Sequence, residues 1–271
     1  MVKATDIKDL KSVKDQFTLK GKKILVSGAT KGLGMAAAAA FAELGADVAI
    51  VGSHPSAKAE ENAAYIAKKF GVRAITIYGD VSKKEDVDRV IETMLAEYGT
   101  IDALFSNAGV ISSDDNGDMP LESWKRMLDI NLTGMFLMDQ AVANYMKAHG
   151  IKGSIVNTGS MSGHIVNHMD GRQMVCYTTT KAGVIHLTKS FAMDYAPVGI
   201  RVNCVSPGTF ISGIHDGKVD EATMQKMAEG YPMGRFGTLD EIVGIIAFLM
   251  TDMASFITGA DYLVDGGYSV R

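Results

Sequence analysis

Cysteine is scarce in this sequence, because its 271 residues include only Cys176 and Cys204. Two cysteines in unrelated contexts provide neither a disulfide framework nor a CxxC site. Long apolar runs are absent too, so no segment is a candidate membrane span, and the first residues alternate charges where a signal peptide would be apolar. We therefore expect a cytoplasmic protein without a membrane partner.

A large excess of one charge is also absent. The formal net charge of -4 at pH 7 gives no reason to expect nucleic acid as a partner. No stretch rich in Pro, Gly or Ser divides the chain, so we expect one domain over residues 21–271, preceded by a polar extension, residues 1–20. His164 and His168 lie four positions apart without further ligands, and no metal site is expected.

Short apolar runs alternate with amphipathic stretches along the chain. The first run is Lys23–Ser27, and similar runs occupy residues 47–51, 73–78, 101–106, 154–158, 201–205 and 262–264. Between them lie helical patterns such as Glu85–Tyr98, in which apolar residues recur every three or four positions. This alternation predicts an α/β fold, a doubly wound parallel sheet of the Rossmann type with helices on both faces. Such sheets bind ligands beyond the carboxyl ends of their strands.

A glycine-rich segment follows the first predicted strand at once. It runs from Gly28 to Gly34 with the spacing GxxxGxG, and an alanine-rich helical stretch, Met35–Leu44, comes next. Glycines at such a junction let the backbone approach a phosphate, and the helix N-terminus offers free N–H groups and a positive dipole end. The segment predicts a nucleotide site, with contacts from Gly28, Thr30, Lys31, Gly32, Leu33 and Gly34.

A tyrosine and a lysine four positions apart suggest the chemistry. If Tyr177 and Lys181 lie on one helix they share a face, and the ammonium favours the ionised phenol. Free tyrosine titrates near ~10, so a fixed cation and a hydroxyl donor such as Ser160 would bring its pKa closer to neutral. That arrangement suits proton transfer to or from an alcohol oxygen. The alternative is an ordinary helix tyrosine beside a solvated lysine, because YxxxK alone has little specificity.

Several motifs, in order, resemble those of the short-chain dehydrogenases/reductases. They are SGATKGLG (27–34), GDVS (79–82), SNAG (106–109), Asn131 in DINLTG, Ser160, YTTTK (177–181) and Pro207-Gly208, and the resemblance spans residues 17–271. It implies an oxidoreductase that uses a nicotinamide cofactor to interconvert a ketone and a secondary alcohol. Within the family, SMSGHIVN (160–167) and the C-terminal TGADYLVDGGYSVR are most similar to the mannitol 2-dehydrogenases and L-sorbose reductases.

The resemblance implies a role for each matching residue. Ser160 would bind the substrate oxygen, Tyr177 would transfer the proton, and Lys181 would lower the phenol pKa and bind the nicotinamide ribose. Asn131 would support a water-mediated proton relay. Further cofactor contacts are implied for Asp80, Val81, Asn107, Ala108, Gly109, Pro207, Gly208 and Ser212. Structural alternatives stay open, since Asn107 and Asn131 are also common turn residues and Asp80 a common helix cap.

The end of the second strand bears on the choice of cofactor. An acid at this place binds the ribose hydroxyls of NAD and repels the 2'-phosphate of NADP. Here Gly52, Ser53 and His54 include no acid, while Lys31 adds a base beside the glycine turn and Ser53 and His54 add hydrogen-bonding groups. We expect NADP(H), and NAD(H) stays an alternative because no arginine follows Gly52.

The segment between Ser160 and Tyr177 is longer than in most members of the family, and we expect it to bulge at the mouth of the pocket. Its polar residues are either contacts for a polyhydroxylated substrate or a spacer: Asn167, His168, Asp170, Arg172 and Gln173. The chain also contains 17 methionines, several of them in segments expected near the pocket. Flexible thioethers suit a less polar substrate, such as a hydroxysteroid.

The sequence as a whole predicts an NADP(H)-dependent alcohol dehydrogenase and carbonyl reductase acting on a ketose/polyol pair, of the fructose/mannitol or sorbose/sorbitol type. Alternatives with the same chemistry are a hydroxysteroid dehydrogenase, a gluconate 5-dehydrogenase and a 3-oxoacyl thioester reductase. A non-catalytic dinucleotide-binding regulator is the alternative of another class. In relatives, helices matching residues 121–149 and 175–195 pair across a dyad, so the resemblance implies a homotetramer.

Overall fold

A seven-stranded parallel sheet forms the centre of the computed structural model, which describes residues 6–166, 168–169, 172–212 and 221–271. The strand order is β3-β2-β1-β4-β5-β8-β11, and it changes direction between β1 and β4. The strands are β1 (Lys23–Ser27), β2 (Asp47–Gly52), β3 (Ala74–Tyr78), β4 (Ala103–Ser106), β5 (Ser154–Thr158), β8 (Arg201–Pro207) and β11 (Asp261–Val264). Each lies where a strand is predicted, with its ends displaced by at most two residues.

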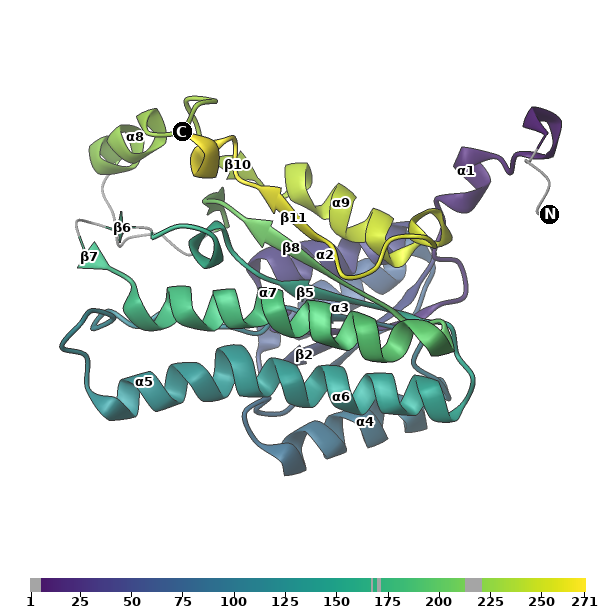
Figure 1. Cartoon of the computed structure of the whole chain (residues 1–271). Coiled ribbons are helices and arrows are strands. Elements are labelled where there is room, and N and C mark those ends of the chain that lie inside the picture. Colours follow the sequence, from purple (N-terminus) through teal and green to yellow (C-terminus); the bar gives the residue numbers. More distant parts are fainter. Residues whose placement is uncertain (1–5, 167, 170–171, 213–220) are drawn as a thin grey trace.

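Helices cover both faces of this sheet (Figure 1). On one face α2 (Gly32–Glu43), α3 (Ala57–Phe70) and α9 (Asp240–Met250) share a core cluster with the strands. On the other face the cluster contains residues of α4 (Lys84–Tyr98), α6 (Gly134–Ala148) and α7 (Val175–Tyr195). The short helix α5 (Leu121–Leu128) continues into α6 through a π-helical turn, Asp129–Thr133. The predicted doubly wound α/β fold is confirmed.

The apolar runs follow from burial of the sheet on both sides. Ile24 and Val26 of β1 belong to one core cluster, while Leu25 between them belongs to the other. All three side chains are fully buried. Because successive strand residues point to opposite faces, a central parallel strand has to be apolar at every position, which makes such strands visible in a sequence.

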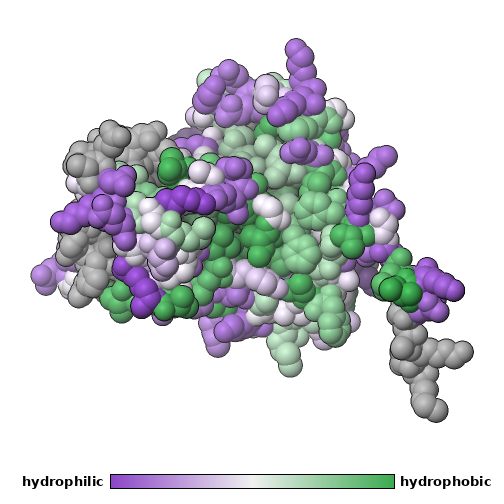
Figure 2. Space-filling view, turned by 90° about the horizontal axis from the view of Figure 1, so that it is seen from above, coloured by the Kyte–Doolittle hydropathy of each residue, from purple (hydrophilic) through white to green (hydrophobic). Residues whose placement is uncertain are grey.

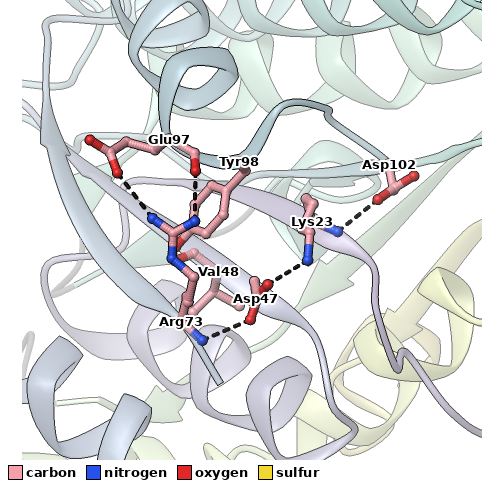
Figure 3. Close-up of polar contacts among 7 residues, drawn as sticks. All are labelled: Lys23, Asp47, Val48, Arg73, Glu97, Tyr98 and Asp102. Atoms are coloured by element: carbon pink, nitrogen blue, oxygen red, sulfur yellow. Dashed lines mark hydrogen bonds and ion pairs between the residues drawn. The ribbon is translucent and has the colours of Figure 1, made fainter. Parts of the chain in front are cut away.

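Polar contacts hold the amino ends of three strands (Figure 3). Lys23 and Asp47, the first residues of β1 and β2, form an ion pair, and the Asp47 carboxylate accepts the N–H of Arg73 at 2.7 Å. The Arg73 guanidinium reaches the end of α4, where it pairs with Glu97 at 3.0 Å and lies over the ring of Tyr98. These contacts fix the register at the edge of the sheet opposite the predicted ligand site.

Small elements surround the carboxyl edge of the sheet, and the sequence did not predict them. They are η3 (Met161–Gly163), β6 (His168–Met169), β7 (Arg172–Gln173), β9 (Phe210–Ile211), α8 (Glu221–Glu229) and β10 (Gly237–Thr238). β6 pairs with β7 in antiparallel fashion and β9 with β10 in parallel. Short 3-10 turns also follow α7, α9 and β11, namely η4 (Ala196–Val198), η5 (Asp252–Ala254) and η6 (Tyr268–Val270).

The segment that separates Ser160 from Tyr177 therefore contains the turn η3 and the two paired strands β6 and β7. Of its predicted substrate contacts, Asn167 and Asp170 lie outside the described residues. The same holds for the side chains of His168, Arg172 and Gln173, whose backbone alone is described. A substrate role for these five side chains stays a prediction.

The N-terminal residues lie apart from the sheet. The turn η1 (Ile7–Asp9) and the helix α1 (Val13–Gln16) project from the body of the molecule (Figure 1), and neither contains a buried residue. Leu19, which is 1% exposed, is the first core residue. The division at residue 20 between extension and domain stays a prediction. In the described part of the chain, no helix has both the length and the hydrophobicity to cross a membrane.

Candidate active site

A cleft of about 340 Å³ opens at the carboxyl edge of the sheet, where the loops after β1, β4, β5 and β8 meet. The first two of these strands flank the point at which the strand order changes direction, the usual place for a ligand in an open α/β sheet. Predicted site residues that line the cleft are Gly28, Lys31, Gly32, Leu33, Asn107, Gly109, Ser160, Tyr177, Lys181, Pro207, Gly208 and Ser212.

Met161 and Met174 also line the cleft, and they belong to the methionine-containing segments expected near the pocket. Other cleft residues were not selected from the sequence: Val110, Ile111, Thr158, Gly159, Ser162, Thr209, Phe210 and Leu239. Thr158 and Gly159 lie at the predicted end of a strand, so the rule that ligands bind at carboxyl ends could have found them. The apolar members carry no such signal. They occupy loops, where the side chains that face a pocket cannot be recognised by periodicity.

The glycine turn forms the end of the cleft next to α2. Gly28 and Gly32 have φ angles of 62° and 57°, in the left-handed region that favours glycine. A Cβ atom on Gly28 would lie 2.6 Å from the Cα of Ala108, and one on Gly34 would lie 2.5 Å from the Gly28 carbonyl oxygen. No side chain caps the start of α2. The turn therefore combines close backbone approach with a helix N-terminus that can bind an anion.

Asn107 connects this turn to the neighbouring strands. Its N–H donates to the Ser27 hydroxyl at 2.9 Å, and its Nδ2 donates to the Gly28 carbonyl at 3.0 Å. The Thr158 hydroxyl, at the end of β5, donates to the Asn107 Oδ1 at 3.1 Å. These bonds give Asn107 a structural task in addition to its place in the cleft, because they hold the glycine turn against β4 and β5.

Ser160, Tyr177 and Lys181 come together in the same cleft. Tyr177 and Lys181 lie one turn apart on α7, and Ser160, two residues after β5, lines the same cleft with its hydroxyl near that of Tyr177. Lys181 is 3% exposed, and its Nζ donates to the Thr158 carbonyl at 2.6 Å. The same Nζ lies 5.7 Å from the centre of the Tyr177 ring. The structure thus assembles the hydroxyl, phenol and ammonium that the sequence suggested.

Burial shifts the pKa of two of these groups. Desolvation raises the pKa of Tyr177 above its ordinary value, and the hydrogen bond from Ser160 opposes this rise. Desolvation also lowers the pKa of Lys181, to about 8. The expected lowering of the phenol pKa is therefore not seen, because desolvation of the phenolate dominates and Lys181 is not among the causes of the shift. An effect of Lys181 on the phenol pKa stays a prediction. Tyr177 is a neutral phenol at neutral pH, which is the form that a general acid requires.

Asn131 lies behind the cleft in the π-helical turn and is fully buried. Its Nδ2 donates to the Val110 carbonyl at 2.9 Å, and the Val110 N–H donates to its Oδ1 at 2.8 Å. A Cβ atom on Gly109 would lie within 3.7 Å of both the Asn131 Oδ1 and the Lys181 Nζ. The side chain of Asn131 therefore fixes one wall of the cleft, which agrees with the structural role considered as an alternative for this residue. Its role in a proton relay stays a prediction.

The remaining predicted cofactor residues lie at the same edge of the sheet but do not line this cleft: Thr30, Gly34, Ser53, His54, Asp80, Val81 and Ala108. Ser53 and His54 are exposed just beyond β2, with the Ser53 hydroxyl 2.9 Å from the His54 Nδ1. Asp80 accepts the N–H and the hydroxyl of Ser82, at 3.1 and 2.7 Å, so its carboxylate closes a turn. Within the described residues, no three His, Cys, Asp or Glu side chains gather as metal ligands.

Comparison with known proteins decides the family. The family model described as enoyl-(acyl carrier protein) reductase matches residues 28–269. A solved structure of a short-chain type dehydrogenase/reductase from Mycobacterium marinum is 40% identical, with a TM-score of 0.89, and the match covers 96% of this chain and 100% of that one. The chain belongs to the short-chain dehydrogenases/reductases.

Relatives of this short-chain dehydrogenase/reductase include proteins named as mannitol dehydrogenases and a sorbose reductase. An NADP-dependent mannitol dehydrogenase of Hypocrea jecorina is 37% identical over 95% of this chain and 96% of its own length. A sorbose reductase of Candida albicans is 36% identical over 95% of this chain and 90% of its own length. The predicted resemblance to the mannitol dehydrogenase and sorbose reductase branch is confirmed at this level of similarity.

Proposed function

We propose that this short-chain dehydrogenase/reductase is an NADP(H)-dependent alcohol dehydrogenase and carbonyl reductase that interconverts a ketose and a polyol, with Tyr177 as the general acid and base. The observation that carries the proposal is the placement of Ser160, Tyr177 and Lys181 in one cleft that begins at the glycine turn. A protein that only binds a dinucleotide needs the turn, but it does not need a phenol with these two partners.

The residues present fit a dinucleotide. The glycine turn has no space for a Cβ atom at Gly28 or Gly34, the start of α2 carries no side-chain cap, and the cleft continues from there to Tyr177. When bound, a nicotinamide cofactor supplies or accepts the hydride. The chain itself has to bind the phosphates, orient the substrate and move a proton.

Each catalytic side chain has a free group for its task. Ser160 Oγ accepts the Ser162 N–H at 3.1 Å, which leaves the hydroxyl proton for a hydrogen bond to Tyr177 or to a substrate oxygen. Tyr177, neutral because burial raises its pKa, donates its proton to the carbonyl oxygen during reduction. Lys181 uses one of its protons on Thr158, and its remaining two suit the hydroxyls of a ribose.

Charge supports NADP(H) as the cofactor. Lys31 is exposed, lines the cleft and precedes α2, and among the described residues it has no ion-pair partner. The turn after β2 contains no acid that would repel a 2'-phosphate. The mannitol dehydrogenase of Hypocrea jecorina is NADP-dependent by its name, which agrees with this choice. NAD(H) is the alternative that the next experiment tests.

Replacing Lys31 with alanine should weaken NADPH binding by about 10-fold or more and leave NADH binding almost unchanged, because a charge-assisted hydrogen bond to phosphate contributes on the order of 2 kcal/mol. Titration of nicotinamide fluorescence with each cofactor measures both affinities. Lys68→Ala, which removes an exposed lysine of α3, is the matched control. An equal loss for the two cofactors would assign Lys31 to the shared part of the dinucleotide and remove the charge argument.

The substrate class rests on the polyol relatives, and one observation favours a second candidate. Val110, Ile111, Met161 and Met174 give the cleft an apolar wall, which would also suit a ketosteroid or another less polar ketone. Oxidation of NADPH, followed in the reduced-nicotinamide absorbance band with D-fructose, L-sorbose, 5-ketogluconate, a 3-oxoacyl thioester and a ketosteroid, separates these classes. Highest kcat/KM with a ketose is expected, and highest kcat/KM with the steroid would overturn the ketose assignment.

We also propose a homotetrameric assembly and a cytoplasmic location. Met193 of α7 and Leu263 of β11 are exposed at 80% and 40%, and hydrophobic residues gather over the middle of the face seen in Figure 2. Such surface supports contacts with further copies of the chain. A small-molecule ketone or alcohol is the partner that the cleft can accommodate.

A further inference from the structure

The catalytic tyrosine lies in the least secure part of its helix. α7 begins at Val175, so Tyr177 is its third residue and belongs to the first turn. The N–H groups of a first turn have no partners within the helix, and a side-chain cap usually binds them. Met174 occupies the cap position of α7 and provides no such bond, and the first turn contains no acidic residue. The helix therefore lacks a local device that would keep Tyr177 in place.

An acid from a distant loop supplies the missing cap. Asp115 Oδ1 accepts the N–H of Cys176 at 2.7 Å, and its Oδ2 accepts the N–H of Tyr177 at 2.9 Å. The Asp115 side chain is buried, with the residue 4% exposed. Both oxygens of the carboxylate thus bind consecutive amides at the positive end of the helix, which is where a negative charge is most favourable.

The loop that carries Asp115 also forms a wall of the cleft. Val110 and Ile111, earlier in the same loop, line the cleft. Asp114 holds the loop to α5 by accepting the Ser123 hydroxyl at 2.7 Å, whereas the carboxylate bonds to the start of α7 come from Asp115. Asp115 is therefore the point at which the wall of the cleft is attached to the turn that bears the phenol.

The negative charge of Asp115 also acts on the side chain of the neighbouring residue in this turn. Burial raises the pKa of the neighbouring Cys176 thiol to about 11, and the negative charge of Asp115 contributes to this rise. Cys176 is fully buried, and its Sγ lies 3.6 Å from the Trp124 carbonyl oxygen. The Cys176 thiol therefore stays protonated and carries no negative charge that would repel the Asp115 carboxylate.

We propose that Asp115 is a positioning residue for Tyr177. Asp115 caps the first turn of α7 and thereby fixes the distance between the phenol and the cleft wall that contains Val110 and Ile111. The inference rests on the proposed function, in which Tyr177 transfers a proton. Without the carboxylate, the first turn opens and the phenol spends less time within reach of Ser160. A small displacement of a proton donor lowers turnover strongly, whereas the cofactor turn at Gly28–Gly34 is unaffected.

Hydrogen exchange tests the cap without reference to any substrate. In the wild-type protein the amides of Cys176 and Tyr177 should be protected, and Asp115→Ala should raise their exchange by at least about 10-fold, since a cap to two amides is lost. Asp114→Ala, which loosens the same loop at α5, is the matched control and should leave these two amides protected. Equal exchange in wild-type and Asp115→Ala protein would refute the cap, whether or not the chain reduces a ketose.

Kinetics then test the consequence for catalysis. Asp115→Ala should lower kcat by about 10- to 100-fold with the NADPH affinity unchanged, and Asp115→Asn, which keeps one acceptor oxygen, should recover part of the loss. If Asp115→Ala does not fold, Asp115→Asn alone should give the intermediate loss. A kcat within about threefold of wild type in both folded variants, as expected of a residue that only adds stability, would overturn the positioning role. Absence of ketone reduction in wild-type protein would instead refute the proposed function.

Discussion

Substitution of Tyr177 by phenylalanine should lower kcat for ketone reduction by at least about 100-fold, because it removes the proton that the substrate oxygen accepts. The ring stays in place, so the first turn of α7 and its contact with Lys181 should persist. The cofactor turn lies on another element of the chain. NADPH affinity, measured by fluorescence titration, should therefore stay within about twofold of the wild-type value.

Tyr195→Phe is the matched control for this experiment. Tyr195 ends the same helix, is not among the described residues that line the cleft, and uses its hydroxyl for a bond of 2.8 Å to Asn144. It should retain wild-type turnover. If Tyr177→Phe kept kcat within a few-fold of wild type, another group would be the proton donor and the mechanism proposed above would be wrong.

Replacing the buried Asp139 with asparagine should stabilise the protein at alkaline pH. Asp139 lies on α6, fully buried, and its Oδ2 accepts the Asn157 Nδ2 at 2.8 Å. The Asp139 Oδ1 and the Asn157 Oδ1 find no hydrogen-bond partner among the described residues. Burial raises the pKa of Asp139 from its ordinary 3.8 to about 7. An asparagine at this position would be neutral at every pH, and its Nδ2 could donate to the Asn157 Oδ1.

The sign of the pH dependence follows from the raised pKa. The folded protein holds the Asp139 proton more tightly than the unfolded chain, so the contribution of Asp139 to stability is complete below about pH 4 and is lost as the pH rises to about 7. At pH 8.5 the asparagine variant should be more stable than wild type by about 2–4 kcal/mol, and by less at pH 5.5. Urea unfolding at the two pH values measures this difference.

A second aspartate provides the control for Asp139. Asp129 is exposed at the start of the π-helical turn, so Asp129→Asn should change stability equally at both pH values. The interpretation of Asp139 as a destabilising buried charge would be wrong if its asparagine variant were less stable than wild type at pH 8.5, or if the difference did not grow with pH.

The sheet could be predicted because its central strands are buried on both faces. The inner residues of a strand such as Lys23–Ser27 are apolar on both faces, and burial on two sides leaves few other arrangements for them. Small elements such as the paired strands β6 and β7 were missed, because two-residue strands contain too few positions to show a period.

The residues proposed as catalytic could be predicted for a different reason. Tyr177 and Lys181 lie on one helix, so their spacing of four positions already places both side chains on one face of that helix. The expected lowering of the Tyr177 pKa is not seen, because burial of the phenol depends on the packing of separate elements. A sequence shows which charges are near in the chain, but not how much water each one loses.

Two buried aspartates show what sequence patterns conceal. Asp115 precedes Tyr177 by 62 positions, and its loop has no period that would indicate a contact with the start of α7. Asp139 interrupts an otherwise apolar face of α6, and a sequence pattern would assign this charged residue to the solvent. In both cases the structure was needed, because the partners come from elements that are distant in the chain.

The most direct test of the central claim follows the hydride. Wild-type protein would be given NADPH that carries deuterium on the transferred position of the nicotinamide, together with the ketose that it reduces fastest, and the polyol would be analysed by mass spectrometry. The account predicts one deuterium in each polyol molecule, on the carbinol carbon, and none when Tyr177→Phe replaces the wild-type protein for the same short time. Consumption of NADPH without a deuterated alcohol, or no consumption with any ketone, would contradict it.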